Sequence, residues 1–160
     1  MKNITFVSIF FLGVLCSFNS DAIDRKSFYA ALSGHSEESI DREIANLGIG
    51  KKTSFSRAYL GAAQMKKADF LKAAGNKVKL FKKGAFSLEE EIKANSGNTE
   101  YRFLRLTIQE NAPKILKYNK NIDEDKKAVL AGYSKLEPDL KEIIRNYAGS
   151  SKIINVDDLK

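Results

Sequence analysis

Large apolar residues recur at intervals of three and four along most of this chain, which is the spacing of one face of an α-helix. The clearest case is residues 99–111, TEYRFLRLTIQEN. Its apolar positions form two stripes, Tyr101, Leu104 and Ile108 on one and Phe103 and Leu106 on the other. Because a helix that is apolar on two sides is usually packed between neighbours, we predict that this segment is a central, buried helix.

The same periodicity predicts helices on both sides of the central one. They cover about residues 24–33, 36–47, 53–74 and 76–95, then a short piece at 113–118 and helices that begin at Asp123 and Pro138. Asp24, Ser36, Asn98 or Thr99, and Asp123 are suitable N-cap residues, and Gly34, Gly48 and Gly75 are suitable stops. Alternating β-strand patterns are absent. The predicted fold is therefore all-α, an array of antiparallel helical hairpins with six to seven helices.

The third and fourth predicted helices have features that bear on how they pack. The inward positions of the fourth helix are Val78, Leu80, Phe81, Ala85, Leu88 and Ile92. Gly84 lies in the middle and weakens the prediction of one unbroken helix. In the third helix the small residues Ala58, Gly61 and Ala62 leave room for another helix backbone to come close.

The first 22 residues resemble a targeting segment. Lys2 is followed by an apolar run of about 15 residues, shorter than the roughly 20 that a stable membrane anchor needs. Ser20 and Ala22 are small residues at the positions that a signal peptidase reads, so we predict a signal peptide at residues 1–22. The alternatives are lipidation of Cys16 and a retained anchor. The mature chain is then one helical domain, residues 23–150, with a C-terminal tail at 151–160 that docks or stays free.

Composition narrows the possible chemistry. Cys16 is the only cysteine, so the mature chain has no disulfide and no thiol nucleophile. His35 is the only histidine and lies in a predicted turn, and no set of metal ligands is recognisable. We therefore predict a non-enzymatic protein without cofactor or metal. The net charge of +7 fits an acidic partner or an anionic surface, and it fits plain solubility equally well.

Part of the chain is similar to a tetratricopeptide repeat. Residues 88–101, LEEEIKANSGNTEY, resemble the end of helix B, the turn and the next helix A of that family, and residues 58–63, AYLGAA, resemble its small-residue packing motif. The resemblance covers about residues 54–111. Ser96 replaces the usual turn proline, and the two helix-A segments are about 43 residues apart, whereas the family repeats at 34. The resemblance implies antiparallel helix pairs that bind protein on a concave face.

Two groups of side chains are candidate binding residues. The first is a basic face at residues 66–83, formed by Lys66, Lys67, Lys72, Lys77, Lys79, Lys82 and Lys83. The second lies on the central helix and consists of Tyr101, Arg102, Arg105 and Gln109. Two guanidinium groups one turn apart can bind a carboxylate or phosphate, or they can pair with Glu110 or the acidic run 89–91 of the same chain. We favour the internal pairing.

Taken together, these patterns predict a non-catalytic, secreted or periplasmic protein-interaction module. Its expected partner is another envelope or secreted protein, and nucleic acid is not expected because the chain is exported. The alternative is a protein that binds an anionic small molecule, lipid or envelope component through Arg102, Arg105 and the basic face. No membrane span is expected once the leader is removed.

Overall fold

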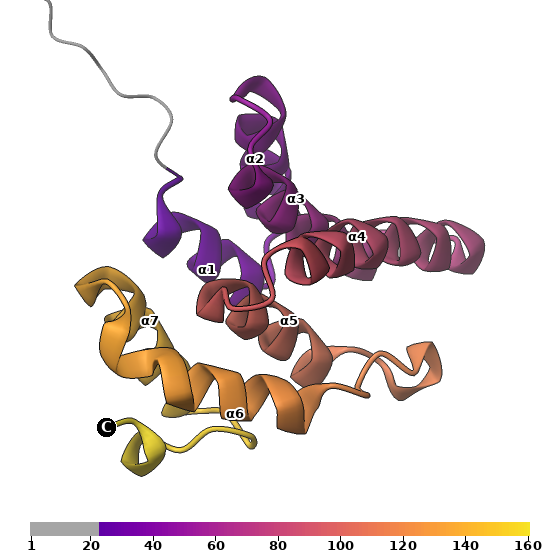
Figure 1. Cartoon of the computed structure of the whole chain (residues 1–160). Coiled ribbons are helices and arrows are strands. Elements are labelled where there is room, and N and C mark those ends of the chain that lie inside the picture. Colours follow the sequence, from indigo (N-terminus) through magenta and orange to yellow (C-terminus); the bar gives the residue numbers. More distant parts are fainter. Residues whose placement is uncertain (1–22) are drawn as a thin grey trace, which may run out of the picture.

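The structure, a computed structural model, describes residues 23–160. Across these residues seven α-helices and four short 3-10 helices follow one another, and no strand occurs among them (Figure 1). The all-α prediction is therefore confirmed. The predicted signal peptide at residues 1–22, with Cys16, lies outside the described residues.

The elements follow the predicted order. They are α1 (Arg25–Ser33), α2 (Glu37–Ile49), α3 (Ser54–Lys67), η1 (Ala68–Phe70), α4 (Ala74–Ala94), α5 (Thr99–Asn111), η2 (Lys114–Leu116), α6 (Ile122–Gly132), η3 (Tyr133–Lys135), α7 (Pro138–Ala148) and η4 (Val156–Asp158). The caps expected at Asp24, Ser36 and Asn98 are present, since each side chain accepts a hydrogen bond from the backbone N–H three residues later.

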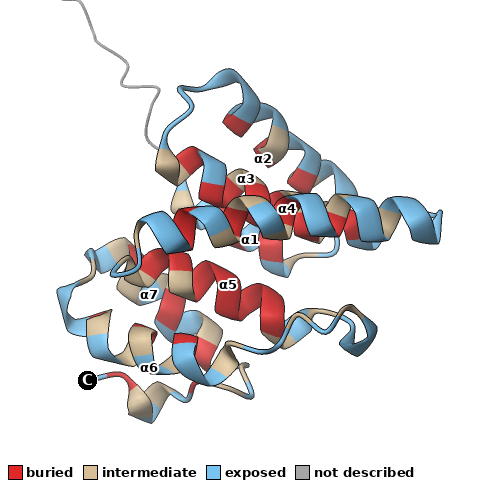
Figure 2. Cartoon of the chain, turned by 45° about the vertical axis from the view of Figure 1, so that its right-hand side comes forward, coloured by how far each residue is buried: buried red, intermediate tan, exposed pale blue. Residues whose placement is uncertain are grey.

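The central position belongs to α5. Figure 2 shows this helix buried along most of its length between α4 on one side and α6 and α7 on the other. All five apolar residues of the two predicted stripes are buried, and so are Glu100, Arg105, Thr107 and Gln109. The polar face of α5 is therefore covered as well, because α6 packs over it.

The close approach of α3 and α4 depends on two glycines. A Cβ atom added to Gly61 would lie 2.7 Å from the carbonyl oxygen of Gly84, and one added to Gly84 would lie 2.4 Å from that of Gly61. The two backbones therefore touch at a point where neither helix tolerates a side chain. This contact explains the glycine inside α4, which is an unbroken helix of 21 residues.

Four details of the sequence prediction are wrong. α3 ends at Lys67 and not at residue 74, because the chain must reverse before α4 packs antiparallel on α3, and Gly75 therefore lies inside α4. The second helix passes Gly48 and is capped by Gly50. Val78 is 38% exposed because the first turns of α4 extend beyond the other helices (Figure 1). The N-cap of α6 is Asn121 and not Asp123.

The C-terminal tail is docked on the helices. Ile154 is fully buried and Leu159 is 7% exposed. Glu110 on α5 accepts hydrogen bonds from the Ser151 hydroxyl at 2.7 Å and from the backbone N–H of Lys152 at 2.6 Å. These contacts place the start of the tail against the end of the central helix.

Candidate functional site

The polar residues predicted on α5 surround one buried carboxylate of α6. Arg105 donates from Nε and Nη2 to the two oxygens of Asp125, each at 2.7 Å, and Gln109 donates to Asp125 at 2.7 Å. Arg102 reaches the same carboxylate at 3.3 Å and Glu124 at 2.7 Å. Asp125 has no exposed surface, so this arrangement joins α5 to α6 inside the protein.

The arginines of this cluster face inward and have their charge compensated. The third nitrogen of Arg105, Nη1, donates to Glu89 of α4 at 2.6 Å. Burial lowers the pKa of Arg105, but the hydrogen bonds and charges of Asp125 and Glu89 outweigh it, and the net pKa is raised. Glu89 belongs to the acidic run 89–91 that was expected as a possible internal partner of the arginines, whereas Asp125 was not among the expected partners. The geometry is that of a structural ion-pair network.

Two other candidate residues also make internal contacts. Tyr101 is 3% exposed, and its hydroxyl donates to Ser54 of α3 at 3.1 Å. Lys67 is bound to Glu37 and Asp41 of α2 at 2.7 and 2.6 Å. These contacts hold α3 against α5 and α2. Of the candidate binding residues, Lys66 is the one that lines an open space.

That space is a cavity of about 780 Å³ among α1, α3, α5 and α7. Its volume lies in the range of ligand pockets, roughly 300–1,000 Å³. Large apolar side chains form one part of the wall, and about half of the lining residues are polar or charged. The large apolar residues are Tyr29, Leu32, Met65, Phe70, Phe81, Phe103, Ile108, Ile143 and Tyr147. None of Tyr101, Arg102, Arg105 and Gln109 contributes to the wall.

Stacked aromatic rings make one side of the cavity rigid. The centroids of Tyr29 and Phe103 lie 5.3 Å apart, and the ring of Phe103 meets that of Tyr147 edge-on, also at 5.3 Å. Phe103 and Met65 are almost completely buried. Since these residues belong to four different helices, the cavity is a product of the tertiary fold.

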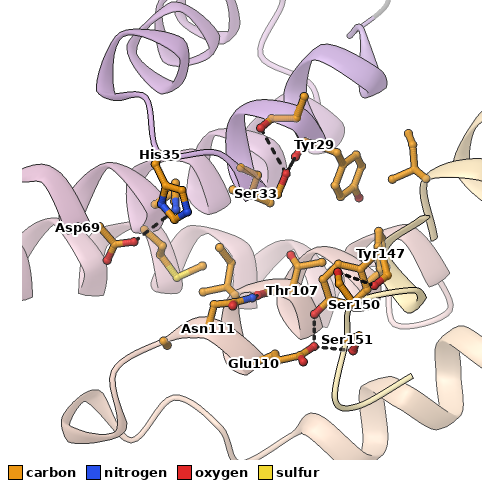
Figure 3. Close-up of a pocket in the computed structure, with 18 of the residues that line it drawn as sticks. Tyr29, Ser33, His35, Asp69, Thr107, Glu110, Asn111, Tyr147, Ser150 and Ser151 are labelled. Atoms are coloured by element: carbon orange, nitrogen blue, oxygen red, sulfur yellow. Dashed lines mark hydrogen bonds and ion pairs between the residues drawn. The ribbon is translucent and has the colours of Figure 1, made fainter. Parts of the chain in front are cut away.

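Polar groups lie at the two ends of the cavity (Figure 3). At one end are His35, Asp69 and Lys66, and the Lys66 ammonium lies 3.7 Å from Asp69 and 5.8 Å from the centre of the Phe70 ring. At the other end Glu110 accepts hydrogen bonds from Tyr147 and Ser151. The acid at this second end is thus already satisfied, whereas Lys66 makes no hydrogen bond to any described residue.

A separate polar cluster lies behind the aromatic wall. Tyr59 donates to Glu100, which also accepts from Arg25 at 2.8 Å and 3.1 Å. The hydroxyl of Tyr29 is buried close by without a hydrogen-bond partner among residues 23–160. Burial raises the pKa of Tyr29, and the charge of Glu100 raises it further. Both tyrosines are therefore neutral at any physiological pH.

The carboxylate of Glu91 joins α4 to the start of α3. Ser54 and Arg57 both donate to it. Burial acts to raise the pKa of Glu91, but the hydrogen bonds from Arg57 and Ser54 outweigh burial, and the pKa is lowered. Glu91 is charged at neutral pH and acts as an acceptor in this contact.

Nothing in the described part of the chain assembles a familiar catalytic centre. Residues 23–160 contain no cluster of three or more His, Cys, Asp and Glu side chains that could hold a metal ion. His35 is exposed at the cavity mouth and makes no hydrogen bond to a described residue. No helix within this range is both long enough and apolar enough to cross a bilayer.

Comparison with protein-family models, with curated proteins and with solved structures finds no significant match for this chain.

The cavity is the feature that sequence reasoning missed. Its wall residues were assigned to the core, because a residue that faces a cavity and one that faces a neighbouring side chain have the same helical spacing. Lys66 was singled out only as part of a run of lysines. A weak signal was available in the aromatic residues of α1, α5 and α7, whose size exceeds what a tightly packed helix crossing needs.

Proposed function

We propose that this protein is a non-catalytic binding protein that holds a small amphipathic molecule in the cavity among α1, α3, α5 and α7. The observation that carries the proposal is the cavity itself, about 780 Å³ with a wall that is partly apolar and aromatic. Concave sites with apolar and aromatic side chains and a few polar groups are where proteins usually bind small molecules. This pocket beside the central helix has that composition.

The wall chemistry defines the body of the ligand. Partly exposed wall residues such as Phe70 and Ile143 offer no side-chain hydrogen bonds, so they favour an aliphatic chain or an aromatic ring system. Burying such a group contributes about 25 cal/mol per Å² of apolar surface.

The polar ends define the head group. Glu110 is bound by three donors, and Glu142 pairs with Lys26 at 2.9 Å, so neither acid is available to a ligand. Lys66 has only the half-exposed Asp69 at 3.7 Å, beyond hydrogen-bond distance. A carboxylate that enters beside Lys66 gains a charge-assisted hydrogen bond that Asp69 does not provide. The proposed ligand is thus an apolar molecule with an anionic head, such as a fatty acid.

This proposal selects the second of the two functions expected from the sequence but moves its site. Arg102 and Arg105 support the fold, and Lys66 is kept as a binding residue. Export to the periplasm or the exterior, the absence of catalysis and a partner among envelope or secreted proteins stay predictions. The repeat-like arrangement of hairpins also stays a prediction, supported by the antiparallel packing of α3 on α4 and of α5 on α6.

The test is a titration of the full chain with dansyl-labelled undecanoic acid, excited in the dansyl band. Dansyl emission rises when the probe leaves water, so we expect saturable enhancement. Ala30 is exposed on α1 at the cavity wall, and Ala30→Trp should fill the mouth and weaken binding at least tenfold. Ala131→Trp is the matched control, since Ala131 is exposed on α6 away from the cavity.

The head group is tested with a second pair of variants and a neutral probe. Lys66→Gln should weaken binding of the acid about tenfold and leave binding of the corresponding alcohol unchanged. Lys127→Gln removes an exposed lysine of α6 and should change neither. The proposal is wrong if the folded protein gives no saturable emission, or if Ala30→Trp and Ala131→Trp bind the probe equally.

A further inference from the structure

The outward side of α4 carries a set of lysines around one aromatic ring. We define the outer face of α4 as the exposed residues Lys79, Lys82, Lys83, Phe86, Glu90 and Lys93. Figure 2 shows exposed segments along the whole length of α4, alternating with its buried positions. None of the residues of the outer face lines the cavity described above.

Phe86 occupies the middle of this face. It follows Lys82 by four residues and Lys83 by three, so these two lysines are its neighbours on the helix surface. Lys79 and Lys93 are each seven residues away and lie two turns along the same face. The Phe86 side chain is 70% exposed. An exposed phenylalanine is costly in water and is not needed for the packing of α4, whose buried side consists of Phe81, Gly84, Leu88, Glu91 and Ile92.

The lysines of the outer face lack internal partners. Within residues 23–160 no ion pair involves Lys79, Lys82, Lys83 or Lys93. Glu90 is the one acid of the face and is exposed as well. The predicted basic face at residues 66–83 is therefore divided. Lys66 lines the cavity, Lys67 binds α2, and Lys77 donates to the backbone oxygen of Asp69. The exposed lysines are Lys72, Lys79, Lys82 and Lys83.

We infer that the outer face of α4 docks the protein on an anionic lipid bilayer, with the lysines among the head groups and Phe86 inserted at the level of the acyl boundary. Each lysine close to an anionic leaflet is attracted by its surface potential. An aromatic ring is favoured at the same depth, where its apolar body leaves water. The distance from Lys79 to Lys93 along the helix is about 21 Å, so the face spans several head groups.

The choice of cation favours lipid over an acidic protein. Every cation of the face is lysine, which is a strongly hydrated point charge on a flexible chain and suits a diffuse anionic surface. Protein interfaces are instead depleted in lysine and enriched in arginine. In this protein four of the six arginines pair with carboxylates across elements, namely Arg25, Arg57, Arg102 and Arg105.

The experiment is flotation of the full chain with vesicles of phosphatidylcholine, with and without one quarter phosphatidylglycerol. Wild type and variants share residues 1–22, so any contribution of that segment is common to all of them. We expect binding only to the anionic vesicles and release by high salt. The triple variant Lys79→Gln, Lys82→Gln, Lys83→Gln should partition about 100-fold more weakly, since each lysine contributes about fivefold. Phe86→Ala should weaken binding about tenfold.

The matched control removes the same charge elsewhere. Lys120, Lys127 and Lys135 are exposed and form no ion pair in the described chain, and their triple change to Gln should leave at least a tenth of the wild-type affinity. Circular dichroism verifies that each variant is folded. Equal loss in the two triple variants, or equal binding to neutral vesicles, overturns the inference. So does an acidic protein that binds wild type and not the α4 variant while the vesicles bind neither.

Discussion

Replacing Asp125 with alanine should destabilise the protein strongly, because this one side chain satisfies three others. It accepts hydrogen bonds from both sides of the Arg105 fork, from Gln109 and, at 3.3 Å, from Arg102. In the Asp125→Ala variant the Arg105 guanidinium, which is 4% exposed, keeps Glu89 as its only carboxylate partner in the described chain.

The magnitude follows from the burial of the pair. Removing one partner of a buried ion pair costs about 3–5 kcal/mol. In Asp125→Ala the Arg105 guanidinium stays buried with Glu89 alone, so two of its three hydrogen bonds to carboxylates are lost. This is a large part of a total stability of about 5–15 kcal/mol. For a domain of this size each kcal/mol lowers the melting temperature by about 4 °C, so we expect a decrease of about 12–20 °C.

The assay is thermal and urea denaturation followed by circular dichroism. Asp123→Ala is the control, since Asp123 is exposed in the same acidic run and its loss costs only a helix-dipole interaction of about 0.3–1 kcal/mol. The double variant with Arg105→Ala should be less destabilised than the sum of its single variants, because the first change already removes the interaction. Similar melting temperatures for Asp125→Ala and Asp123→Ala would falsify the structural role of the cluster and restore the α5 arginines as a binding face.

Three further predictions concern the packing and the remaining polar contacts. Gly84→Ala should destabilise the protein by about 1–3 kcal/mol in urea denaturation, because its Cβ enters the facing backbone, whereas Gly75→Ala meets open space and should be neutral or slightly stabilising. Tyr29→Phe should raise the free energy of unfolding by about 1 kcal/mol, because the Tyr29 hydroxyl is buried without a described partner. Tyr59→Phe should lower it by about 1.5–3 kcal/mol, because a hydrogen bond to the Glu100 carboxylate is lost. Because the pKa of Glu91 is lowered in the folded state, the Glu91 carboxylate stabilises the fold fully above the unfolded carboxyl pKa of about 4.3. This stabilisation is lost as the pH falls through the folded pKa. In urea denaturation Glu91→Gln should therefore be less stable than wild type at neutral pH and should lose less stability on acidification.

Local features of the fold were predictable because their causes are local. The N-caps of α1, α2 and α5 depend on a side chain and a backbone N–H three residues apart, and Asp24, Ser36 and Asn98 have suitable side chains. The end of α3 was not predictable in the same way. Residues 68–73 contain neither glycine nor proline, and the chain leaves the helix there because α4 must return along α3.

The environment of the α5 polar face depends on a distant segment. The spacing of Arg102, Arg105 and Gln109 correctly placed them on one side of the helix, and a face of that composition usually meets water. Here α6 covers it and supplies Asp125, about 20 residues later in the chain. No periodicity within α5 encodes that partner, and the internal partners expected from the sequence were Glu110 and the acidic run 89–91.

The cavity was beyond sequence reasoning for a different physical reason. A void is fixed by the angles and distances between helices, and these depend on contacts elsewhere, such as the glycine contact of α3 with α4. Tyr29, Phe103 and Tyr147 have the same hydrophobic signal whether they fill space or line it. Only the position of Lys66 near the end of α3 was a sequence feature that the structure connects to the cavity.

The distribution of the two kinds of cation links the fold to both proposals. The guanidinium groups of Arg102 and Arg105 are used inside the molecule, where the planar fork of Arg105 binds the Asp125 carboxylate through two hydrogen bonds. These pairs also neutralise the acids Glu89 of α4 and Glu124 and Asp125 of α6. The lysines, which hold a fixed geometry less well, are left on the surface, and the charge of +7 is therefore presented mainly by lysine. A surface of this kind attracts anions without selecting their shape, so selectivity must come from the apolar groups beside it: the aromatic cavity wall next to Lys66, and Phe86 among the lysines of α4.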